Sequence, residues 1–125
     1  MQPELIWAAG FFDGEGSTCV GRGDGTKRHP PQLRIAIQQT ELEPLERFQR
    51  AVDAGTLRGP YDRRRRSTHR PYYSYEIRRH DEVLGVLESL WPYLCLPKRQ
   101  QARAAFTLIE QLMECPVCIT WDEMP

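Results

Sequence analysis

Residues 8–16, Ala-Ala-Gly-Phe-Phe-Asp-Gly-Glu-Gly, place two carboxylates at the end of a segment in which small residues stand side by side. The small flank at Ala9 and Gly10 lets another backbone approach closely. If that backbone is the same segment of a second copy, Asp13 and Glu15 of both copies converge near a two-fold axis, where cations must neutralise them. Mg²⁺ is commonly held by one or two carboxylates plus substrate phosphates, so the pattern indicates metal-assisted hydrolysis of nucleic acid.

A simpler interpretation stands beside this one on residue chemistry alone. Asp-Gly-Glu-Gly can be a turn between a helix and a strand, in which Asp13 bonds to backbone amides, because Gly and Asp dominate turns.

The elements that must position these carboxylates follow from the spacing of apolar residues. Helical spacing runs from Leu5 to Asp13, where the glycines end it. Leu33, Ile35 and Ile37 alternate with polar residues, which predicts a strand with one apolar and one hydrogen-bonding face. The predicted elements are a helix over 3–13, strands over 17–22 and 32–39, a helix over 41–54, strands over 56–61 and 71–79, and helices over 81–90 and 98–114. This order predicts an α+β fold with an antiparallel sheet and helices on one face.

Length and composition bound the class of protein. A chain of 125 residues with 40% hydrophobic residues suits one domain, spanning 1–125. The longest apolar run, residues 5–12, is far shorter than the roughly 20 residues of a membrane span, and no basic leader precedes it. We expect a soluble, intracellular protein with neither a membrane nor a small-molecule substrate as partner.

The net charge of zero does not exclude a nucleic-acid partner, because the charges are segregated. Residues 58–79 contain eight arginines against Asp62 and Glu76, whereas only acidic charges follow Arg103. A basic surface attracts phosphate through its local field, whatever the total charge.

Residues 8–16 resemble the nine-residue signature of the LAGLIDADG homing endonucleases, with Ala8 in place of the first leucine. Residues 35–40, Ile-Ala-Ile-Gln-Gln-Thr, resemble the family's second strand, and residues 91–102, Trp-Pro-Tyr-Leu-Cys-Leu-Pro-Lys-Arg-Gln-Gln-Ala, resemble its Pro-Tyr-Leu…Lys…Gln-Ala segment. The resemblance implies an αββαββα(α) unit whose four-stranded antiparallel, saddle-shaped sheet binds DNA. It also implies cleavage of both strands of a specific site.

The resemblance further implies a role for each matching residue. Glu15 binds the catalytic metal with help from the backbone carbonyl of Gly14, and Asp13 is a structural cap. Gln39 organises water and Lys98 stabilises charge on the scissile phosphate, so Glu15, Gln39 and Lys98 are the expected catalytic residues. The implied cofactor is Mg²⁺, with Mn²⁺ or Ca²⁺ able to replace it for binding.

A single copy of the signature implies a homodimer on a palindromic or near-palindromic DNA site. The expected interface residues are Ile6, Ala9, Gly10 and Asp13. Some family members carry a further basic group after the second strand, where this chain has Glu41 and Glu43.

The outward face of the predicted sheet offers side chains that can read DNA, because Arg pairs with guanine and Gln with adenine in the major groove. The arginine run adds contacts to phosphates. A solvated sheet face is the commoner explanation of such alternation. The expected DNA-binding residues are Ser17, Cys19, Gln32, Arg34, Gln38, Arg58, Arg63, Arg64, Arg65, Arg66, Arg70, Tyr72, Ser74 and Arg78.

Two other functions stay open. One is a DNA-binding protein or RNA maturase on the same scaffold that does not cleave. The other is an unrelated α+β dimerisation module. Cys115 and Cys118 have a metal-like spacing, but zinc needs four ligands and no second pair stands nearby, so no zinc site is expected.

Overall fold

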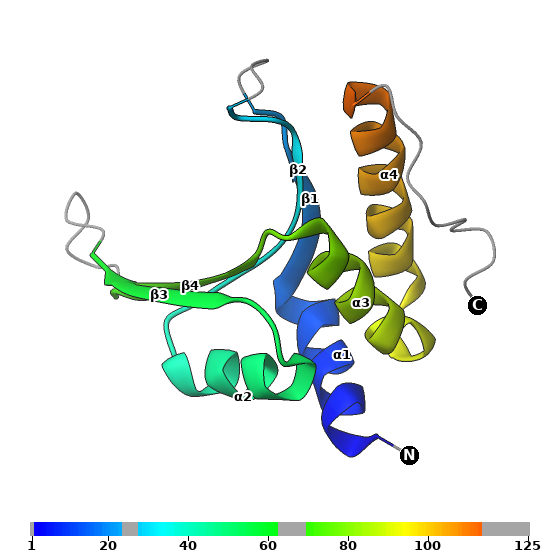
Figure 1. Ribbon diagram of the computed structural model, residues 1–125. Helices are drawn as coiled ribbons and strands as arrows, with labels where there is room; N and C mark the ends of the chain where they lie inside the picture. Colours follow the sequence, from blue (N-terminus) through cyan, green and yellow to red (C-terminus); the bar gives the residue numbers. More distant parts are fainter. Residues whose placement is uncertain (1, 24–27, 63–69, 114–125) are drawn as a thin grey trace.

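The computed structural model describes residues 2–23, 28–62 and 70–113 (Figure 1). In chain order its elements are α1 (Pro3–Glu15), β1 (Gly16–Gly21), β2 (Gln32–Gln39), α2 (Leu42–Val52), β3 (Thr56–Tyr61), β4 (Tyr72–Ile77), α3 (His80–Leu90), the 3-10 turn η1 (Trp91–Tyr93) and α4 (Leu96–Met113). The strands form one antiparallel sheet in the order β1-β2-β4-β3. The predicted α+β fold class is confirmed.

The sheet has one covered and one open face. Figure 1 shows the helices on one side of the sheet, while the β1–β2 and β3–β4 hairpins point in different directions, so the sheet is bent. On β2, Leu33, Ile35 and Ile37 are buried against the helices, whereas Gln32 and Gln38 are exposed on the other face. The alternation seen in the sequence therefore separates core from surface as predicted.

Strand pairing extends the separation between the covered and the open face from β2 to the neighbouring strands. Ile35 pairs with Ile77 and Ile37 with Tyr75, and all four side chains are buried. Because opposite residues in an antiparallel pair project to the same face, the residues between them lie together on the open face.

Aromatic rings connect α1 and α2 to the sheet. The Phe12 ring of α1 stacks on Phe48 of α2 with centroids 6.3 Å apart, and Phe48 meets Tyr75 edge to face at 5.3 Å. The Tyr75 hydroxyl donates a hydrogen bond to the carbonyl of Ala54, and burial raises the pKa of this phenol. This column fixes α1 beneath the middle of the sheet.

Helix α1 extends further than predicted. Gly14 and Glu15 are helical, so the predicted end at Asp13 is wrong. Gly16 takes an extended conformation and starts β1, and a Cβ there would lie 2.4 Å from the ring of Phe12. Packing of that ring, rather than the weak helix preference of Gly14, sets the end of the helix.

Most other boundaries agree with prediction to within two residues. Strands 32–39 and 56–61 match residue for residue, while α4 begins at Leu96, two residues earlier than predicted. No helix within the described ranges is both long enough and apolar enough to cross a membrane.

Candidate metal and nucleic-acid site

The end of α1 brings Glu15 beside Gln39. Glu15 is the last residue of α1 and is exposed, and Gln39 is the last residue of β2. Because β1 pairs with β2 in the register Gly16 to Ile37, the end of β2 runs past the end of the helix. The Gln39 Nε2 donates a hydrogen bond of 2.8 Å to Glu15 Oε2. This contact orients the carboxylate.

Lys98 reaches the same junction from α4. Its Nζ donates a hydrogen bond to the carbonyl of Gly16, and it lies 6.0 Å from the centroid of the Phe12 ring. The ammonium is therefore held beside the residue that follows Glu15. The three residues predicted to be catalytic come from separate elements: Gln39 contacts Glu15 directly, and Lys98 contacts the backbone of Gly16, the next residue along the chain.

Asp13 fastens the start of α4 to the end of α1. Its carboxylate accepts the backbone N–H of Cys95, at 3.1 Å and 3.3 Å for the two oxygens. The Asp13 carboxylate, by hydrogen bond and charge, also raises the pKa of the Cys95 thiol. Asp13 thus caps the segment that carries Lys98, as a structural anchor.

The junction offers oxygen donors suited to a hard cation. The carbonyls in the last turn of a helix lack helical donors, and Gly14, the residue before Glu15, lies in the last turn of α1. Among the described residues no three His, Cys, Asp or Glu side chains of one chain gather into a metal site. One carboxylate and one carbonyl per chain fit Mg²⁺, which keeps several waters and takes phosphate oxygens, better than a cation enclosed by protein.

One predicted interface residue needs correction. Ile6 is 41% exposed, and a Cβ at Gly10 or Gly14 would meet nothing within 4 Å, so these residues share an open side of α1. Ala9 is 0% exposed. Because neighbouring helical residues point about 100° apart, Ala9 faces the protomer's own core and presents no surface to a partner. Asp13 is half-buried, in contact with Cys95.

The open face of the sheet gathers most of the predicted DNA-binding residues. Pairing aligns Ser17 with Ala36, Cys19 with Arg34 and Gln38 with Ser74, which in turn pairs with Arg58. The residues on this face are Ser17, Cys19, Gln32, Arg34, Gln38, Arg58, Tyr72 and Ser74, with Arg78 just beyond the end of β4.

The remaining predicted contacts fall in residues 63–70 of the sequence, between β3 and β4. Arg70 is exposed, and its Nη2 makes a 2.7 Å ion pair with Glu41, which the sequence did not predict. Arg63, Arg64, Arg65 and Arg66 lie outside the described residues, as do Cys115 and Cys118.

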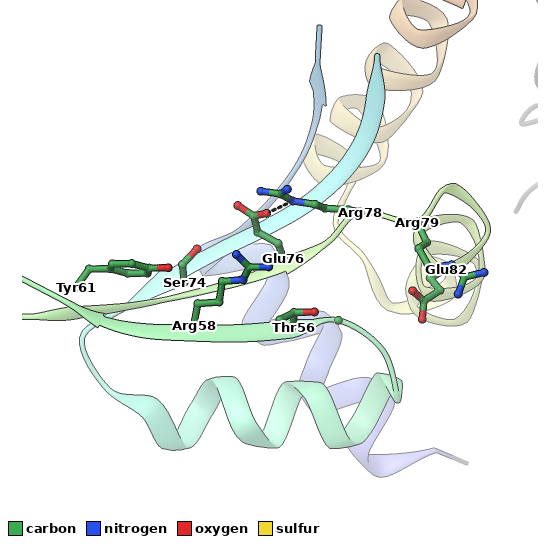
Figure 2. A pocket seen from close by; sticks show the side chains of 9 residues that line it. Thr56, Arg58, Tyr61, Ser74, Glu76, Arg78, Arg79 and Glu82 are labelled. Atoms are coloured by element: carbon green, nitrogen blue, oxygen red, sulfur yellow. Dashed lines mark hydrogen bonds and ion pairs between the residues drawn. The ribbon is translucent and has the colours of Figure 1, made fainter. Parts of the chain in front are cut away.

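A hollow of about 410 Å³ on the open face includes residues that sequence reasoning missed. Strands β3 and β4 form its floor, and Figure 2 shows Arg79 and Glu82 at one end, beyond Glu76 and Arg78. The pairing of Glu76 with Ala36 of β2 and Thr56 of β3 places it on this face, and the pairing of β3 with β4 forms the hollow. The lining residues are Gly55, Thr56, Arg58, Tyr61, Ser74, Glu76, Arg78, Arg79 and Glu82.

No protein-family model matches the sequence, and no curated protein is significantly similar to it. Solved structures do match. The homing endonuclease I-CvuI, in complex with a DNA target in the presence of Mg and with the DNA uncleaved, shares 24% identity and a TM-score of 0.67 over 90% of this chain and 69% of that one. The LAGLIDADG meganuclease I-AabMI bound to uncleaved DNA shares 21% identity and a TM-score of 0.63, over 89% of this chain and 37% of that longer chain.

The homing endonuclease I-TnaI matches almost end to end, with 20% identity and a TM-score of 0.61 over 95% of this chain and 92% of that one. The resemblance read from residues 8–16 is thus confirmed by backbone geometry. With its αββαββαα order and its β1-β2-β4-β3 sheet, the chain has the fold of the LAGLIDADG homing endonucleases.

Proposed function

We propose that this protein is a site-specific, divalent-metal-dependent endonuclease that acts as a homodimer on a palindromic or near-palindromic double-stranded DNA target. The observation that carries the proposal is the meeting of Glu15, Gln39 and Lys98 at the α1–β1 junction. This junction borders the open sheet face, because Gly16 begins β1.

The chain's own groups divide the chemistry between them. Glu15 and the Gly14 carbonyl would hold the cation, and Gln39 keeps the Glu15 carboxylate in place through its amide. Lys98 supplies a fixed positive charge for a phosphate whose negative charge increases in the transition state. A bound Mg²⁺ would polarise the phosphodiester and acidify a water molecule.

Self-association of α1 is supported by its exposed apolar side. Ile6, Gly10 and Gly14 follow one another at spacings of four residues, so they form one stripe along the helix. Glycines in that stripe permit close contact of two helix backbones. A two-fold axis there would bring both Glu15 carboxylates together and match a palindromic target.

DNA binding is supported by the open sheet face and by the fold. The face carries Arg34, Arg58 and Arg78 together with Gln32 and Gln38, which are side chains that contact base edges in the major groove. I-CvuI and I-AabMI, which share this fold, were solved with DNA bound.

The test uses a pool of supercoiled plasmids with randomised palindromic inserts. We expect the wild-type protein with Mg²⁺ to linearise some members, and chelation of Mg²⁺ to stop cutting. Glu15→Gln should bind the recovered sites and lose cleavage by at least about 100-fold. Glu88→Gln, an exposed carboxylate on α3, is the control and should cut normally. Retained cutting by Glu15→Gln would refute the assigned role.

The second candidate is a DNA-binding protein or RNA maturase that does not cleave. It is favoured by the acidic start of α2, where Glu41 is engaged by Arg70 and Glu43 is exposed. DNA binding in a gel shift without Mg²⁺-dependent cutting of any site would establish this function instead.

A further inference from the structure

The hollow on the open face contains an ion pair at the end of β4, between Glu76 and Arg78. Arg78 Nε lies 2.5 Å from Glu76 Oε2, and Figure 2 shows Arg78 bent back towards Glu76. The Arg78 side chain is 53% exposed and that of Glu76 is 28% exposed. The arginine is therefore the more accessible partner, and the carboxylate is its support.

The atoms used in this pair decide what Arg78 can still bind. A guanidinium carries five N–H donors in one plane. The contact to Glu76 is made by Nε, which leaves the two parallel N–H donors at the end of the guanidinium to bind another acceptor. Two parallel N–H donors match the O6 and N7 acceptors of guanine, the commonest specific contact of arginine in the major groove.

Arg34, the neighbouring arginine on β2, is directed towards β1. Arg34 and Arg78 each stand one residue beyond the Ile35–Ile77 pair on adjacent strands. The guanidinium of Arg34 lies over Gly21 of β1, with its Cζ 3.6 Å from the Cβ position of that glycine. The two like charges thus diverge, and Glu76 keeps Arg78 over the β3–β4 side of the sheet.

We propose that Arg78, oriented by Glu76, selects a guanine at one position of each half-site. This inference rests on the proposed DNA-binding function and deepens it. A carboxylate beside a phosphate-binding arginine weakens the attraction to DNA, since it repels phosphate. Beside a base edge the same carboxylate holds the arginine in the plane that guanine requires. Arg78 is the specificity-determining residue and Glu76 is a positioning residue.

The experiment is selection of binding sites from a randomised palindromic DNA pool, with Ca²⁺ as the cation and sequencing as the readout. We expect the wild type to enrich guanine at a position where Arg78→Ala shows no preference, a change of about 5- to 150-fold. Glu76→Ala should lower the preference at that same position by about threefold, as an exposed ion pair allows, while its affinity for unrelated DNA stays equal or rises. Glu82→Gln removes a charge from the same hollow and should leave the preference intact.

The double variant Glu76→Ala/Arg78→Ala tests the coupling. It should show the same base preference as Arg78→Ala alone, because the carboxylate acts through the arginine. An unchanged guanine preference in Arg78→Ala, or equal loss of affinity for all sequences in Glu76→Ala, would overturn the inference and leave the DNA-binding function standing. If the wild type enriches no site at all, the proposed function itself fails.

Discussion

At the scale of single residues, replacing Lys98 is the change that best distinguishes DNA binding from the cleavage step. Its Nζ is held by the Gly16 carbonyl and not by a carboxylate, so its positive charge is not neutralised by that contact. In the proposed reaction this charge would stabilise the negative charge that develops on the phosphate in the transition state.

Replacing this lysine by methionine keeps most of the apolar stem and removes the charge. We expect Lys98→Met to bind its target nearly as well as the wild type and to cleave it about 10²- to 10³-fold more slowly, the usual effect of losing one preorganised donor. Single-turnover cleavage with enzyme in excess measures the chemical step. Arg50→Met, an exposed cation on α2, serves as the matched control. Equal cleavage rates for both variants would remove Lys98 from the catalytic machinery.

At the scale of elements, the α1–β1 junction depends on a glycine. The Cβ of any other residue at position 16 would collide with the Phe12 ring, which is itself buried against Phe48 and cannot move away freely. The clash must be relieved by shifting α1 or the ring, and either movement disturbs the column of aromatic rings beneath the sheet.

We therefore expect Gly16→Ala to lower the free energy of unfolding by about 1–3 kcal/mol. Gly85→Ala is the matched control, because Gly85 is an exposed helical residue whose Cβ would meet nothing within 4 Å. That variant should be more stable by up to about 1 kcal/mol, from helix propensity alone. Urea denaturation followed by circular dichroism measures both. A Gly16→Ala protein as stable as the wild type would show that the junction tolerates a side chain.

The same junction shows how far sequence reasoning reaches. Strand periodicity predicted β2 correctly, since alternation depends only on which face each residue takes. It could not predict that Gly14 is helical or that Ala9 is enclosed, because those follow from the packing of Phe12 and the sheet. The resemblance selected Glu15, Gln39 and Lys98 together; in the structure Gln39 contacts Glu15 and Lys98 contacts the adjacent Gly16, while their catalytic roles stay a prediction. The hollow beside Glu76 depends on the register between β3 and β4, which the predicted strands over 56–61 and 71–79 do not specify.

At the scale of the whole molecule, the proposed homodimer would build its site from two protomers. In the described part of the chain, Glu15 presents an exposed carboxylate at the junction, and α1 leaves an apolar stripe uncovered on the side away from its own core. A helix that is apolar on nearly all sides is ordinarily buried on all sides. The proposed dimerisation through α1 would cover Ile6 and Gly10 and would bring a second Glu15 close to the first.

A large side chain in the stripe would block dimerisation and the approach of the second Glu15 without disturbing the fold of the protomer. We expect Gly10→Leu to fold as a monomer, because a Cβ there has open space in the protomer, while the longer side chain keeps the two helix backbones apart. Plasmid cleavage should then fall by at least about 100-fold, since the paired carboxylates no longer meet. Sedimentation velocity gives the oligomeric state, and Gly85→Leu, on an exposed site of α3, should stay dimeric and active. A Gly10→Leu protein that remains a dimer with full cleavage would show that the subunits associate through another surface.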